Sequence, residues 1–119
     1  MTEPTQLLDY ADQVLDGTIG LGARSARTAA LLARCAFEGW LDDMSKAWDT
    51  SQYPRPSTES KLVVLGALRG DVIGQAAMRV WDGLSLACHH HAYELQPSVM
   101  EVRHFIGEVR KLGASVSVG

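Results

Sequence analysis

Three of the chain's four histidines stand in a row, directly after a cysteine and shortly before a tyrosine, in the segment 88–94 that reads CHHHAYE. Imidazole titrates near neutral pH, and it serves proteins as a general acid, a general base or a metal ligand. On a helix, successive side chains turn by about 100°, so the three rings point in different directions. His91 continues the apolar stripe of its predicted helix, whereas His89 and His90 leave it. The segment is the chain's strongest candidate for chemistry.

Three interpretations of these histidines stay open. In the first, His91 is a buried, hydrogen-bonded core residue and its neighbours are solvated. In the second, Cys88 and His91, three residues apart, join Glu101, His104 or Glu108 around a metal ion, although no CxxC or HExxH spacing is present. In the third, a histidine performs the acid–base chemistry of a nuclease. We expect no bound metal and no cofactor.

The end of this predicted helix resembles the signature of HEPN domains (higher eukaryotes and prokaryotes nucleotide-binding). These are small helical-bundle proteins, many of them ribonucleases or toxin partners. Their signature is an arginine, four to six residues, and a histidine that is often followed by one residue and a tyrosine. His91 and Tyr93 match its second part, but Leu86 stands where the four-residue form places the arginine. The nearest preceding arginine, Arg79, lies twelve residues before His91 and ten before His89.

The resemblance implies that His91 acts on a ribose 2'-hydroxyl while an arginine stabilises charge on the phosphate. It also implies that the two groups come from different protomers, across a dimer interface. With Leu86 in the arginine position, that charge has to come from Arg79, Arg34 or Arg103. The candidate catalytic residues are His91, Tyr93, His89 and Arg79. The alternative function is a non-enzymatic helical protein–protein interaction module, in which the histidines only pack and form hydrogen bonds.

The elements that carry these residues are predicted to be helices only. The fold class is all-α, a four- to five-helix up-down bundle with one Pro-rich connection at about residues 50–57. Helices are expected over 3–16 with Thr2 as N-cap, over 23–48, from a cap at Ser57 or Thr58 to Gly70, over 72–95 with Asp71 as N-cap, and over 99–113. Residues 1–113 form the single domain, and 114–119 a frayed tail.

The expected core faces follow helical spacing. In the helix over 23–48, the stripe is Ala26, Ala30, Ala33, Phe37, Trp40, Met44 and Trp48; in the last helix it is Met100, Phe105, Val109 and Leu112.

Composition narrows the function classes. The chain has 119 residues, 46% of them hydrophobic and 21% charged, as in a soluble globular domain. A net charge of -3 argues against non-specific binding of duplex DNA, and no apolar run is long enough for a membrane span.

Two cysteines and a polar start without a secretory signal predict a cytoplasmic protein. We expect a homodimer, because an alanine-rich stripe and three tryptophans leave an apolar face to cover, and RNA or a partner protein as ligand.

Overall fold

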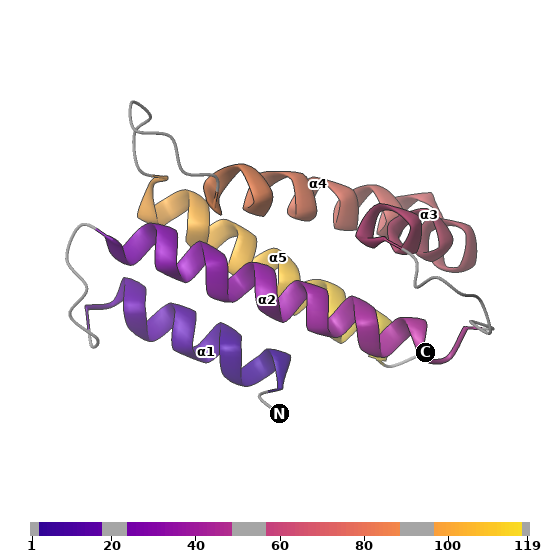
Figure 1. Ribbon diagram of the computed structural model, residues 1–119, viewed down its shortest axis with the longest axis horizontal. Helices are drawn as coiled ribbons and strands as arrows, with labels where there is room; N and C mark the ends of the chain where they lie inside the picture. Colours follow the sequence, from indigo (N-terminus) through magenta and orange to yellow (C-terminus); the bar gives the residue numbers. More distant parts are fainter. Residues whose placement is uncertain (1–2, 18–23, 49–56, 89–96, 118–119) are drawn as a thin grey trace.

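The computed structural model describes residues 3–17, 24–48, 57–88 and 97–117, which form five α-helices and no strand (Figure 1). The prediction of an all-helical bundle is confirmed for these residues. The helices are α1 (Pro4–Leu15), α2 (Ser25–Ser45), α3 (Thr58–Arg69), α4 (Asp71–Cys88) and α5 (Val99–Ser117). None of these helices is long and apolar enough to cross a membrane. Of the predicted Pro-rich connection, only Ser57 belongs to the described residues.

Helix α2 is the centre of the bundle, because it packs against all four other helices. Helix α3 lies at the outside and packs mainly on α4 (Figure 1). Small side chains let the neighbours approach the first half of α2 closely. The alanines at 26, 29, 30, 33 and 36 are all buried there.

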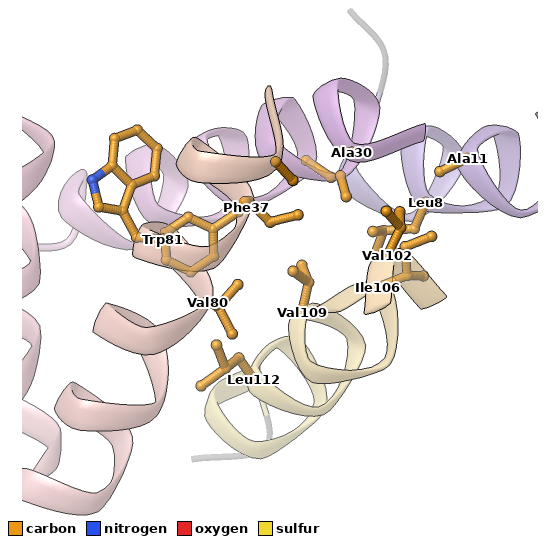
Figure 2. Packing of buried hydrophobic residues seen from close by; sticks show 14 of the residues in the cluster. Leu8, Ala11, Ala30, Phe37, Val80, Trp81, Val102, Ile106, Val109 and Leu112 are labelled. Atoms are coloured by element: carbon orange, nitrogen blue, oxygen red, sulfur yellow. The ribbon is translucent and has the colours of Figure 1, made fainter. Parts of the chain in front are cut away.

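One hydrophobic core joins the helices (Figure 2). Phe37 from α2 stands at its centre, with Trp81 of α4 on one side and Ile106 of α5 on the other. The predicted stripe of α2 holds as far as Phe37. Beyond it the buried positions are Leu41 and Ser45, while Trp40, Met44 and Trp48 are only partly buried, because these three side chains line an open groove at the end of α2.

The helix starts differ from the predictions at two places. At α1 the N-cap is Glu3, not Thr2, and Glu3 and Gln6 form a reciprocal capping box. At α3 the predicted cap Ser57 is confirmed, since its hydroxyl accepts a hydrogen bond from the Ser60 N–H at 3.2 Å. At α4 the cap is Gly70, whose carbonyl accepts from the Gly74 N–H, so the predicted cap Asp71 is the first helical residue.

The helix ends differ as well. Helix α2 stops at Ser45, and residues 46–48 continue as tighter turns in which each N–H bonds the carbonyl three residues back. Helix α5 was expected to end at Gly113 but runs to Ser117, because Gly113 is not among the described glycines with positive φ, which are Gly17 and Gly70. The segment predicted as a tail therefore begins as helix. Residues 89–95, predicted as the last turns of α4, lie outside the described part.

The buried face of α5 is also turned from its prediction. Val109 and Leu112 are buried as expected, but Met100 is 83% exposed and Phe105 is only partly buried. Val102 and Ile106 take their places, because they complete a 4–3–3 spacing with Val109 and Leu112 that follows one side of the helix.

Candidate functional site

The histidine segment lies outside the described residues, so the structure tests neither His89, His91 nor Tyr93. What it gives is the surroundings of Cys88, the last residue of α4 and the direct neighbour of His89. The candidate site is therefore built from the side chains that α2 and α4 place around Cys88.

Trp81, Ser85 and Cys88 follow one another at spacings of four and three residues, so they share one side of α4. That side faces Arg34 of α2. The Arg34 guanidinium lies over the Trp81 ring, 4.7 Å from its centroid. Its Nε is 3.3 Å from Oε1 of Glu38, one turn further along α2, and its side chain remains 33% exposed. Arg34 is therefore held against the protein and is still reachable from solvent.

Two buried side-chain polar atoms in the described part of the chain have no hydrogen-bond partner, and both belong to this place. They are Nε of Arg34, whose approach to Glu38 lacks hydrogen-bond geometry, and Oγ of Ser85. Buried polar atoms are nearly always hydrogen-bonded, either to protein or to ordered water. The α2–α4 face beside Cys88 thus carries unused hydrogen-bonding capacity.

The pKa of the Cys88 thiol depends on burial and on the charges of its neighbours at this face. Burial raises the pKa of the thiol, and the charge and hydrogen bond of Arg34 lower it by less; Cys35 of α2 raises it further and Arg27 lowers it. The thiol therefore stays protonated at neutral pH, so Cys88 is no nucleophile there. Both cysteines are free. Two arginines, Arg27 and Arg34, lie two helical turns apart on α2, and Glu38 pairs with Arg34.

Arg79, the arginine that the sequence analysis put forward, lies in a different place. It lines a groove of about 410 Å³ between α4 and α5, together with Asp82, His104 and Glu108. Arg79 precedes Cys88 by nine residues, which is about 13 Å along α4 and on its opposite side. The structure thus brings Arg79 to the chain's fourth histidine and not to the end of α4.

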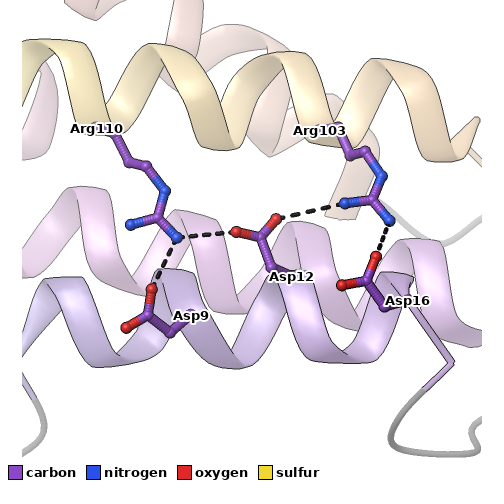
Figure 3. Close-up of polar contacts among 5 residues, drawn as sticks. All are labelled: Asp9, Asp12, Asp16, Arg103 and Arg110. Atoms are coloured by element: carbon purple, nitrogen blue, oxygen red, sulfur yellow. Dashed lines mark hydrogen bonds and ion pairs between the residues drawn. The ribbon is translucent and has the colours of Figure 1, made fainter.

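Arg103, the third arginine considered, is committed to α1. Its guanidinium pairs with Asp16 and with Asp12, while Arg110 pairs with Asp12 and Asp9, so that Asp12 stands between two arginines (Figure 3). Two arginines and three aspartates therefore fasten α5 to α1. This leaves Arg34 as the arginine beside Cys88.

The structure gives the metal interpretation no support within its described ranges, where no three His, Cys, Asp or Glu side chains come together as ligands. His104 lies 3.8 Å from Glu108, in the α4–α5 groove. Glu101 is exposed at the start of α5. These residues face away from the side of α4 that carries Cys88.

Comparison with known proteins found no matching family model, no matching curated protein and no matching solved structure. The HEPN resemblance therefore rests on the residues themselves.

Sequence reasoning named Arg34 only as one of three substitutes, although a signal for it was present. Arg27 and Arg34 are seven residues apart, which puts two cations on one side of a helix whose other side is alanine. Ser85 carried no signal of its own, because a serine in a helix is ordinary until its surroundings are known.

Proposed function

We propose that this protein is a HEPN-like helical bundle that acts on RNA, with His91 as the acid–base group and Arg34 as the group that stabilises phosphate charge. The carrying observation is the Arg34 guanidinium, which lies over Trp81 beside Cys88 while its side chain stays 33% exposed. His91 follows Cys88 by three residues. A phosphate at this face would accept hydrogen bonds from the exposed part of the Arg34 guanidinium.

Arginine suits this role because its planar guanidinium presents several N–H groups in a fixed fork that matches a phosphate. Trp81 and Glu38 hold the Arg34 side chain in place, so less conformational entropy is lost when the phosphate arrives. A histidine that takes the proton of a ribose 2'-hydroxyl lets that oxygen attack the neighbouring phosphorus, and the 5'-oxygen leaves with a proton. The products are a 2',3'-cyclic phosphate and a 5'-hydroxyl, and the reaction needs no metal ion.

In this proposal the arginine and the histidine belong to the same chain, which departs from the two-protomer site that the resemblance implies. The departure follows from Leu86, since the arginine of the usual motif is absent and Arg34 stands beside the end of α4 instead. The proposal includes the up-down order of the helices. It also includes a reducing, cytoplasmic setting, which two unpaired cysteines support.

The experiment is cleavage of short unstructured RNAs in the presence of EDTA, with the product ends identified by mass spectrometry. The wild type should give cyclic phosphate ends. His91→Ala and Arg34→Ala should each lose at least about a hundredfold in rate, and Arg34→Lys should recover only part of that loss because it lacks the fork. Matched controls are His104→Ala and Arg79→Ala, which remove the same side-chain types from the α4–α5 groove. Cleavage that depends on Arg79 and not on Arg34 would reject our assignment in favour of the sequence-based one.

A mixing experiment separates a same-chain site from a shared one. Equal amounts of His91→Ala and Arg34→Ala protein are combined and assayed. A site within one chain stays inactive in the mixture, because no chain holds both groups. Recovery of about a quarter or more of the wild-type rate would show that the two groups come from different protomers.

The second candidate function, a non-enzymatic interaction module such as a toxin partner, is favoured by one observation. Helix α3 exposes Val63, Val64 and Leu68 although it belongs to a folded bundle. Exposed apolar residues gathered on one element mark an interaction surface. Absence of RNA cleavage and of RNA binding in the wild type would leave this function as the better one.

A further inference from the structure

Arg34 has an anionic neighbour on its own helix. Its Nε lies 3.3 Å from Oε1 of Glu38, one helical turn further along α2, and the two side chains are 33% and 45% exposed. Within the described part of the chain, Glu38 forms no other ion pair or hydrogen bond. Its carboxylate therefore acts on Arg34 and on whatever Arg34 binds.

The other described side chains around Arg34 add little charge close by. The indole of Trp81 lies beneath the guanidinium. The Cys88 thiol is protonated at neutral pH because burial raises its pKa. Arg27 stands seven residues back on α2, which is about 10 Å along the helix and about one Debye length at 0.1 M salt. Glu38 is therefore the nearest charge to a ligand on Arg34.

The place of Glu38 also decides where a phosphate can bind. Nε of Arg34 is buried and lies toward Glu38, so a ligand reaches the guanidinium through its terminal amino groups. Carboxylate and phosphate then stand on different edges of one planar group, about 7 Å apart when each is at an ordinary N···O distance. Arg34 attracts both anions, and the two anions repel each other.

This repulsion depends on the charge of the phosphate. A phosphodiester within a nucleic-acid strand carries one negative charge, whereas a terminal phosphomonoester carries nearly two above pH 7. On an isolated arginine, the doubly charged group has the advantage. The Glu38 carboxylate repels it twice as strongly as it repels the diester, and so reduces that advantage.

We infer that Glu38 determines the charge selectivity of Arg34, favouring the singly charged phosphodiester within a strand over the doubly charged phosphomonoester at its end. Arg34 is the phosphate-binding group of the proposed function, on which this inference rests. The substrate of that function is an internal phosphodiester. Its cyclic phosphate product becomes a phosphomonoester when water opens the ring, so the same selectivity limits inhibition by product.

The test is an NMR titration at pH 8 and low ionic strength with two small probes, dimethyl phosphate with one charge and methyl phosphate with two. Imidazoles with an ordinary pKa are neutral at this pH. The indole N–H signal of Trp81 is the reporter, because the Arg34 guanidinium lies over that ring. Trp40 and Trp48, which line the groove at the end of α2, are internal references. Arg34→Ala should abolish the response of Trp81 to both probes.

Glu38→Gln removes the charge but keeps the length of the side chain and an oxygen acceptor. The Kd of dimethyl phosphate should fall about threefold, the effect of a unit charge about 7 Å away in nearly aqueous surroundings. The Kd of methyl phosphate should fall about ninefold, the square of that factor, because the Coulomb energy is proportional to the charge of the ligand. The control Glu59→Gln removes the same charge from the first turn of α3 and should leave both Kd values unchanged.

Several results would overturn the inference. Equal gains for the two probes, no gain, or weaker binding of both in Glu38→Gln would show that Glu38 only holds Arg34 in place. A Trp81 signal that responds to neither probe would show that Arg34 binds no phosphate. RNA cleavage judges the proposed function separately: a protein that binds the probes as expected but cleaves no RNA would keep the selectivity of Arg34 and lose the nuclease.

Discussion

The guanidinium of Arg34 lies over the indole of Trp81, and that indole stacks on the buried ring of Phe37 with the centroids 6.1 Å apart. The three side chains form a continuous stack from the core to the surface. A rigid aromatic platform is thus available beneath a partly exposed cation, and a cation over an indole face is attracted by about 0.5–2 kcal/mol. The core therefore positions the residue on which the proposed chemistry depends.

Removing the platform should separate stability from activity. Trp81→Ala and Leu84→Ala both empty buried space in α4 and should cost about 3–5 and 2–5 kcal/mol of unfolding free energy, respectively. Only Trp81→Ala also releases Arg34. At a temperature where both variants are folded, the RNA cleavage rate of Trp81→Ala should fall well below that of Leu84→Ala. Urea unfolding and the cleavage assay measure the two effects, and equal activities would show that the stack serves stability alone.

Two glycines that meet at the crossing of α3 and α4 should respond oppositely to the same substitution. A Cβ on Gly74 would stand 2.7 Å from backbone of Gly66, whereas a Cβ on Gly66 would stand 3.6 Å from Gly74. Gly74→Ala should therefore destabilise the protein, because α3 has to move away. Gly66→Ala should be neutral or stabilising by up to about 1 kcal/mol, the gain in helix propensity. Thermal unfolding of both variants checks this pair, and a stabilised Gly74→Ala would contradict the close crossing.

Among the ion pairs that join α1 to α5, the carboxylate of Asp12 contacts both arginines. Asp12 pairs with both Arg103 and Arg110, whereas Asp9 pairs with Arg110 alone (Figure 3). Asp12→Ala should therefore cost more than Asp9→Ala, by roughly 0.5–1 kcal/mol, since these partly exposed pairs are screened by water. The difference should shrink at high salt. Urea unfolding at low and high ionic strength measures it, and equal costs at low salt would show that the shared position of Asp12 adds nothing.

The sequence predicted the helices well and their orientation less well. Apolar spacing located all five helices, because burial against a common core imposes a helical period. It did not predict which residues face the core late in α2 and early in α5. Trp40 and Met100 were expected to be buried and are not, because more apolar residues are present there than one side of the helix can bury. Spacing ranks such residues by position only, whereas the structure also selects by how the neighbouring helix fits.

The candidate site was predictable only in part. The chemistry of the histidine segment followed from residue types, but the arginine that accompanies it depends on a contact between α2 and α4. Arg34 and Cys88 are 54 residues apart in the chain. No local motif links them, so Arg34 could not be preferred over Arg79 from the sequence.

The Cys88 thiol gives the protein a pH-dependent stability at alkaline pH. Burial holds the pKa of Cys88 above its ordinary value of 9.0, and Arg34 offsets only part of the rise. Because the unfolded thiol loses its proton first, this contribution is complete below pH 9 and is lost as the pH rises through the folded pKa. In urea unfolding under reducing conditions, the wild type should lose stability as the pH rises above about 9, and Cys88→Ala should lose less. Cys35→Ala is the comparison variant: it keeps the burial that chiefly raises the Cys88 pKa, so it should lose more stability than Cys88→Ala over the same pH rise.

Leu86 tests the resemblance itself, because it occupies the motif's arginine position. Its side chain is 69% exposed, so Leu86→Arg keeps its charge in water and should fold with a stability within about 0.5 kcal/mol of the wild type. If the His91 register is that of the motif, the new guanidinium should raise RNA cleavage, and Leu86→Lys should raise it less for lack of the fork. The same change in an Arg34→Ala background shows whether the two positions serve one phosphate, since a shared role predicts rescue. A folded Leu86→Arg protein with unchanged cleavage, and no rescue, would remove the motif alignment while leaving the Arg34 assignment to be judged by its own variants.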